Sequence, residues 1–312
     1  MATMSQNTTE TSSNNSLDTA DIICLIVFFT QAFIVVLANL LTIITFTINR
    51  HLRKRSMYCV INLAVADMLV GLGSLAVNFV IARIYGFKVL AKENAAQSDS
   101  PAVKIQFHVY TMTCNATMLS IALVALERMS AIMWPLRHRQ CSLRVYALSI
   151  AFTWLASILI AIKGVFSFDD SSKEYLGGIW IISVFSVTCA SYIAIFCKTR
   201  SSQQRSQLHT SPQWSSQDYR LVKTSFLVTV TSFATWIPLA LLFIINDANQ
   251  VTISPYIILF FVVLFVASSF INPIIYVFRM RHFRMALFTL ILHCSPDQPA
   301  KRIRPVGPAP AT

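Results

Sequence analysis

The sequence predicts an all-α integral membrane protein: a seven-transmembrane helix bundle followed by a short amphipathic eighth helix. Two observations carry this prediction, namely seven separate apolar stretches and basic residues that are sorted between the loops joining them. A helix needs about 20 residues to cross about 30 Å of hydrocarbon, and in lipid it satisfies its own backbone groups. The stretches cover residues 21 to 48, 57 to 84, 104 to 133, 143 to 165, 177 to 197, 221 to 246 and 253 to 278.

The basic residues indicate the orientation. If the N-terminus is outside, most of the 25 Lys and Arg residues lie on the cytoplasmic side, and the outer side keeps Arg83, Lys88, Lys92, Lys104, Lys163 and Lys173. The positive-inside rule then places the N-terminus outside and the C-terminus in the cytosol of a multi-pass plasma-membrane protein. Short basic loops beside apolar spans explain the pI near 9.6, so no nucleic-acid partner is expected.

The ends are predicted to be disordered polar tails, extracellular over residues 1–20 and cytoplasmic over 295–312, with the helical domain over 21–294. Asn7 and Asn14 begin acceptor sequons for glycosylation, although an unmodified tail is the alternative. After the seventh stretch, residues 279 to 292 form an amphipathic segment that ends beside Cys294. A palmitoyl group on Cys294 would hold this segment against membrane lipids, and an unmodified thiol is the alternative.

Polar side chains inside the stretches are expected to face the bundle interior, because hydrocarbon does not solvate them. In chain order they are Asn39, Asp67, Thr117, Ser268, Ser269 and Asn272. A lone carboxylate with hydroxyl and amide neighbours can bind a small cation or a proton, so we predict a sodium site at Asp67, Thr117, Ser268, Ser269 and Asn272. The alternative is a hydrogen-bonded structural acid.

Three further features are typical of a conformational switch. Glu127-Arg128 at the inner end of the third stretch and Asp218 at the start of the sixth could form a latch, although a surface ion pair is the alternative. Pro238 after Trp236 predicts a kink in the sixth stretch, so a rotation near Trp236 would displace its inner end. Asn272-Pro273, followed by Tyr276, repeats this device in the seventh.

Together, in order and on successive stretches, these motifs resemble the rhodopsin-like (class A) G-protein-coupled receptors. Further matches are Leu63-Ala64-Val65-Ala66-Asp67, Trp154, Tyr192 in the fifth stretch, and Glu127-Arg128-Met129 in place of Asp/Glu-Arg-Tyr. The resemblance implies binding of an extracellular ligand, activation of a heterotrimeric G protein, and regulation by receptor kinases and arrestin. It implies a receptor and no enzyme.

The departures are also informative. Val103 and Lys104 stand where the family has a cysteine, no cysteine lies in a predicted outer loop, and Val184 replaces the usual proline. These losses resemble the melanocortin, cannabinoid and sphingosine-phosphate branch, so a melanocortin-like peptide receptor is an alternative. A membrane transporter is an alternative from another class, but no internal repeat supports it.

The expected ligand is a small molecule, apolar or lipid-like. Tyr110 stands where amine receptors have Asp, and the seventh stretch lacks the lysine that retinal would need, so neither an amine anchor nor retinal is expected. The outward faces of the third, sixth and seventh stretches offer a mainly apolar pocket: Tyr110, Thr111, Cys114, Trp236, Leu239, Ala240, Phe243, Val262 and Val266. Ordinary helix packing is the alternative for each of these residues. No cofactor is expected beyond Na⁺ as an allosteric ion.

Overall fold

A computed structural model describes residues 19–49, 52, 55–84, 101–166, 170–206, 216–249 and 254–293. Within these ranges the chain forms nine helices: α1 (Thr19–Ile48), α2 (Met57–Ile84), α3 (Pro101–Met133), α4 (Pro135–Gln140), α5 (Leu143–Phe166), α6 (Asp170–Ser206), α7 (Ser216–Asn249), α8 (Pro255–Arg279) and α9 (Arg281–His293). Seven of these described helices are long and apolar enough to cross a membrane. The predicted fold class is confirmed, and the chain is a multi-pass membrane protein.

The helices extend past several predicted boundaries. The fifth apolar stretch was expected over 177 to 197, whereas α6 begins at Asp170 and ends at Ser206. A helix bonds its own backbone, so it continues through polar residues beyond the hydrocarbon. Hydrophobicity marks the part of a helix that lies in lipid and does not mark where the helix ends.

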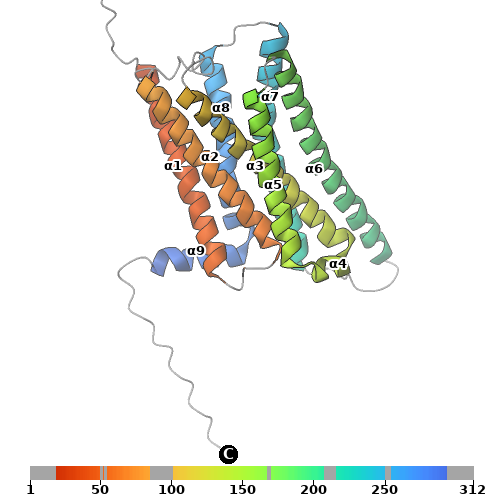
Figure 1. The fold of residues 1–312 in the computed structure, drawn as a ribbon. Coiled ribbons are helices and arrows are strands. Elements are labelled where there is room, and N and C mark those ends of the chain that lie inside the picture. The colour runs from red at the N-terminus through yellow and green to blue at the C-terminus, as the bar shows by residue number, and fades with distance from the viewer. Residues whose placement is uncertain are drawn as a thin grey trace, which may run out of the picture.

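The seven long helices stand side by side, and α3 passes through the middle of the bundle (Figure 1). It contacts α2, α5, α6 and α7, whereas α1 packs against α2 and α8, and α7 against α8. The short α4 and the transverse α9 lie at the same end of the bundle as Arg128, near the end of α3 (Figure 1). We call this end the Arg128 end.

Two glycines allow α2 to approach its neighbours closely. A Cβ at Gly71 would lie 2.9 Å from Val35 Cγ1 and from Val36 Cγ2 on α1. A Cβ at Gly73 would lie 3.1 Å from the Tyr110 ring on α3. Small residues bring membrane helices together in this way, so α1, α2 and α3 form one tightly packed group.

The proline in α8 is compensated by a side chain from α1. Pro273 has no N–H, so it cannot bond the carbonyl of Ser269 four residues earlier. Asn39 Nδ2 donates to that carbonyl at 2.9 Å and also to Val35 O at 2.9 Å. An unbonded carbonyl inside a membrane protein is costly, so this bond both satisfies α8 and attaches it to α1.

The α9 helix is the predicted eighth helix, and an aromatic cluster anchors it. Phe283 is buried, its ring lies 4.9 Å from Phe46 of α1 and 6.1 Å from Tyr276 of α8, and Met280 and Leu287 pack against the same core. Ile291, one turn after Leu287, remains 47% exposed. The helix therefore lies across the Arg128 end, with its outer half available to lipid headgroups and acyl chains.

Candidate functional site

At the Arg128 end, Glu127 is the centre of a small charged cluster. The side chains of Glu127 and Arg128 are each 5% exposed, and Glu127 Oε2 lies 3.1 Å from Arg128 Nε. Glu127 Oε1 lies 2.9 Å from His138 Nε2 on α4, and the Tyr146 hydroxyl of α5 lies 3.0 Å from the same nitrogen. The Glu127 carboxylate therefore links α3 to α4 through His138, and it also balances the charge of Arg128.

The Glu127–Arg128 contact is an ion pair without hydrogen-bond alignment, so the Nε–H of Arg128 has no hydrogen-bond partner among the described residues. A buried guanidinium N–H that has no hydrogen-bond partner can bind a new acceptor without first breaking a hydrogen bond. The arrangement is therefore suited to exchange of partners.

Near the middle of the bundle, Asp67 is fully buried between α2, α3 and α8. Asn272 Nδ2 donates to Asp67 Oδ2 at 2.8 Å, and the hydroxyls of Thr117 and Ser269 face the same carboxylate. The structure thus brings together four of the five residues predicted for this site. Asp67 Oδ1, Thr117 Oγ1 and Asn272 Oδ1 of this site have no hydrogen-bond partner among the described residues, and the same is true of Asn39 Oδ1 on α1.

Ser268, the fifth residue predicted for the sodium site, is hydrogen-bonded to Trp236 instead. Trp236 Nε1 donates to Ser268 Oγ at 2.8 Å, and this hydroxyl donates in turn to Phe265 O at 2.7 Å. The indole also packs against Phe265, with ring centroids 5.6 Å apart. The hydrogen bond between Trp236 and Ser268 therefore connects α7 to α8. Ser268 lies four residues before Asn272 on α8, and Pro238 follows Trp236 by two residues on α7.

Tyr192 makes the corresponding connection between α6 and α7. Its hydroxyl lies 3.1 Å from Thr229 Oγ1, and its ring packs edge-on against Phe226 at 5.2 Å. Tyr192 also shares a buried cluster with Met129 of α3. A movement of α7 at the Arg128 end would therefore break a polar contact and an aromatic contact made by the same side chain.

Comparison with known proteins decides the class of molecule. A family model for the 7 transmembrane receptor (rhodopsin family) matches residues 38–178 and 174–276. The chain belongs to this family.

Individual relatives of the receptor agree with this assignment. It is 23% identical to adenosine receptor A3 of Bos taurus over 86% of this chain and 90% of that protein. It is 27% identical to cannabinoid receptor 1 of Xenopus laevis over 83% of this chain and 61% of that protein. Squid rhodopsin has a similar fold, with a TM-score of 0.72, 19% identity, and coverage of 89% of this chain and 88% of the other. The predicted G-protein-coupled receptor is confirmed, and neither the melanocortin-like peptide receptor nor the transporter alternative is favoured.

The residues predicted to form the receptor's ligand pocket lie on the expected helices. Val266 and Trp236 are buried, whereas Thr111, Leu239, Ala240 and Val262 are partly exposed. Tyr110 packs against Gly73 of α2 and interacts with Cys114 one turn along α3. Their part in ligand binding stays a prediction.

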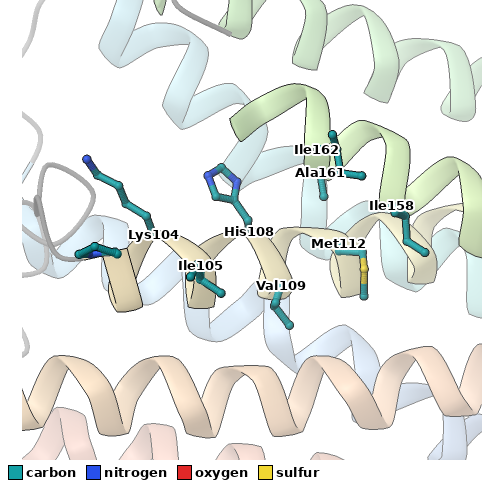
Figure 2. A pocket seen from close by; sticks show the side chains of 9 residues that line it. Lys104, Ile105, His108, Val109, Met112, Ile158, Ala161 and Ile162 are labelled. Atoms are coloured by element: carbon teal, nitrogen blue, oxygen red, sulfur yellow. The ribbon is translucent and has the colours of Figure 1, made fainter. Parts of the chain in front are cut away.

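A described cavity of the receptor lies elsewhere. It lies between α3 and α5 (Figure 2). Its volume is about 480 Å³, and its lining residues on α3 lie at the end of that helix opposite Arg128. Its lining includes Lys104, His108, Met112 and Ala161, and none of the predicted pocket residues.

Several predicted sites lie outside the described residues. They are the sequons at Asn7 and Asn14 and the cysteine Cys294. Asp218 and Phe243 lie within α7, but their side chains are also outside the described part of the receptor. The two-carboxylate latch therefore stays a prediction in its Asp218 half.

Sequence reasoning missed several polar links within the receptor. Asn62 of α2 donates to Ser120 Oγ at 2.7 Å and accepts from Trp154 Nε1 at 2.9 Å, which joins α2, α3 and α5. Trp180 Nε1 of α6 donates to Asn115 Oδ1 of α3 at 3.1 Å. Asn62, Asn115 and Ser120 are polar residues inside apolar stretches, the same signal that identified Asp67. His138 gave no such signal, because it lies outside the apolar stretches, on the short α4.

Proposed function

We propose that the receptor converts binding of an apolar or lipid-like small molecule into nucleotide exchange on a heterotrimeric G protein. The observation that carries this proposal is the cluster at Glu127 and Arg128, where a buried guanidinium is held by an imperfectly aligned carboxylate. The moving element is α7, which contacts its neighbours through Trp236 and Thr229. A ligand can shift such an equilibrium only by binding one arrangement more tightly than the other.

The proposed orientation places the Arg128 end in the cytosol and Lys104 at the outer face of the plasma membrane. It is supported by Arg55, Arg137, Arg139 and Arg144, which gather around α4 at the Arg128 end. Basic residues beside membrane spans are concentrated in cytoplasmic loops. The G protein then approaches the face that carries Arg128, α4 and α9.

Nucleotide exchange on purified G protein tests the coupling. We expect wild-type receptor in lipid nanodiscs to accelerate GTPγS uptake on at least one G-protein type, and Arg128→Ala to reduce this activity to the rate without receptor. Arg144→Ala, a basic residue at the same end, is the matched control and should retain activity. Equal exchange by wild type and Arg128→Ala, at matched receptor amounts, would remove the proposed role of Arg128.

The ligand class follows from the side chains predicted to face it. Trp236, Leu239, Ala240, Val262 and Val266 are apolar or aromatic, and pockets of this kind take apolar molecules with few polar groups. The similarity to adenosine and cannabinoid receptors is consistent with a small-molecule ligand. A screen of lipid-like and heteroaromatic compounds, read out by nucleotide exchange, tests this class, and activation by peptides instead would favour the melanocortin-like alternative.

We propose Na⁺ as an allosteric ion at Asp67. The residues present fit such an ion, since Asp67 Oδ1, Thr117 Oγ1 and Asn272 Oδ1 are buried and lack hydrogen-bond partners among the described residues. A hard cation is bound by oxygen ligands and would balance the buried negative charge. Asp67, Thr117, Ser269 and Asn272 would hold it, whereas Ser268 is already bonded to Trp236.

Regulation by receptor kinases and arrestin is proposed for the loop between α6 and α7, and palmitoylation for Cys294. The placement of α9 supports the second proposal, because its exposed Phe288 and Leu292 allow an acyl chain beside Cys294 to enter the same leaflet. Acyl exchange with hydroxylamine on wild type and Cys294→Ser measures this modification directly.

A further inference from the structure

The cavity between α3 and α5 is an elongated groove open to the outside of the bundle. Its walls include Ile105, Val109, Ile158 and Ile162, all of them large apolar residues between 39% and 64% exposed. Ala161, in contrast, is buried at 8% exposure and lines the groove from α5. The exposed apolar side chains of this wall belong to two membrane-spanning helices, so we take the opening to face lipid.

The groove has a cationic end. Lys104 and His108 project from the same side of α3, one helical turn apart, beside the apolar side chains (Figure 2). Lys104 lies 24 residues before Arg128, so the two are about 36 Å apart along α3. This distance exceeds the roughly 30 Å hydrocarbon thickness, so Lys104 lies at headgroup depth when Arg128 is at the opposite membrane surface.

The volume of the groove limits its occupant. A cavity of about 480 Å³ holds roughly sixteen water-sized groups at about 30 Å³ each. From Pro101 to Met112 the groove follows α3 for about 16 Å. These dimensions match one alkyl chain with a small head group.

From this geometry we infer that the groove is a binding site for a long-chain carboxylic acid, an unesterified fatty acid of the surrounding membrane. The carboxylate binds Lys104, with His108 beside it, and the alkyl chain lies on Val109, Met112, Ala161 and Ile162. An ammonium has three donors and can therefore hold a carboxylate while it keeps another contact. The site is separate from the proposed ligand pocket, and its occupancy does not depend on the ligand found there.

A photoreactive palmitate analogue tests this inference on the full-length receptor in zwitterionic nanodiscs. After irradiation, mass spectrometry would locate the adducts, and unlabelled palmitate would compete. We expect adducts concentrated on residues 104–112 and 158–162. An equally lipid-exposed segment of α6 around Ile182 serves as the internal comparison. Adducts spread evenly over the lipid-facing surface would overturn the inference.

Three variants separate a carboxylate site from simple filling by lipid. Lys104→Gln should lower labelling of the groove about fivefold, as expected for loss of one partly exposed charge pair, and Lys104→Arg should restore it. Ala161→Phe should block the groove, whereas Ile182→Phe on α6 should have no effect on it. Each variant would first be checked for an unchanged melting temperature. If Ala161→Phe does not fold, the comparison of Lys104→Gln with Lys104→Arg still decides the test.

Head-group chemistry is tested with the methyl ester of the same photoreactive chain and with unlabelled phosphatidylglycerol as a competitor. The ester should label the groove no more than the α6 comparison segment, and the diacyl lipid should compete at least about fivefold less well than palmitate. Equal labelling by acid and ester, or equal competition by the diacyl lipid, would show a nonspecific acyl groove or a phospholipid site and would reject the inference. Loss of nucleotide exchange in the Arg128→Ala experiment would leave these results unaffected.

Discussion

Glu127 binds His138 of α4 as closely as it binds its own neighbour in sequence. Glu127 Oε1 lies 2.9 Å from His138 Nε2, and Glu127 Oε2 lies 3.1 Å from Arg128 Nε. The charge that restrains Arg128 is therefore also held by the loop between α3 and α5. Any change in the position of α4 alters the environment of Arg128 directly.

His138→Phe should raise ligand-free nucleotide exchange roughly fivefold. The variant leaves a buried carboxylate oxygen without its donor, which destabilises the present arrangement by about 1 kcal/mol or more. His138→Gln retains a donor and is the conservative control, and Tyr146→Phe removes only the neighbouring 3.0 Å contact. Ligand-free exchange by His138→Phe at or below the wild-type rate would contradict this role.

Asp218→Ala should also raise ligand-free exchange if Asp218 is the second carboxylate near Arg128. Losing one member of a partly buried charge pair shifts an equilibrium that is balanced within a few kcal/mol. Asp297→Ala in the C-terminal tail is the charge-matched control. Cells with equal surface expression of the variants would be compared, and an unchanged basal signal in Asp218→Ala would remove this residue from the latch.

Sodium should lower agonist affinity in wild-type receptor, and Asp67→Asn should abolish the effect. Thr117→Ala and Ser269→Ala should weaken it, because both hydroxyls face the Asp67 carboxylate. Ser268→Ala should leave sodium sensitivity largely intact, since that hydroxyl is bonded to Trp236. Agonist competition binding in NaCl and in choline chloride measures this, and a wild type insensitive to sodium would refute the site.

Asn39 and Pro273 should show strong coupling in a double-mutant cycle. Asn39→Ala leaves the Ser269 carbonyl without its donor and should destabilise the purified receptor by about 1–3 kcal/mol. In a Pro273→Ala background the new N–H can bond that carbonyl within α8, so removing Asn39 should cost about 1 kcal/mol less. Thermal unfolding in detergent measures the four variants, and additive losses would show that the two residues act independently.

Agonist-induced internalisation should depend on the loop between α6 and α7 more than on the tail. The chain after Cys294 offers only Ser295 and Thr312. The segment from the end of α6 through the loop to the first residue of α7 holds eight hydroxyls: Thr199, Ser201, Ser202, Ser206, Thr210, Ser211, Ser215 and Ser216. Each phosphate adds about −1.5 to −2 charges to a basic segment. Replacing the loop hydroxyls with Ala should reduce internalisation, and truncation after Cys294 should not. The opposite result would assign regulation to the tail, and the loop serines would then serve solubility alone.

Hydrophobicity and single polar residues predict much of this receptor. Asp67, Thr117, Ser269 and Asn272 were grouped from sequence, and the structure places them together, because buried polar groups in a membrane bundle have few places to meet. The bond between Ser268 and Trp236 was not predicted, since two neighbouring serines on one helix differ by about 100° in direction. Likewise, the contact of His138 with Glu127 depends on how the short α4 turns back against α3, which no periodic pattern in the sequence predicts.

Close packing at Gly71 and Gly73 has a consequence for spectroscopic work on this receptor. With Val35 and Tyr110 almost in contact with its backbone, α2 has no space to shift relative to α1 and α3. It can therefore serve as the fixed frame for measuring motion elsewhere. Leu72 on α2 and Leu227 on α7 are both exposed, so each can carry a spin label. A change in the distance between the two labels would then report movement of α7.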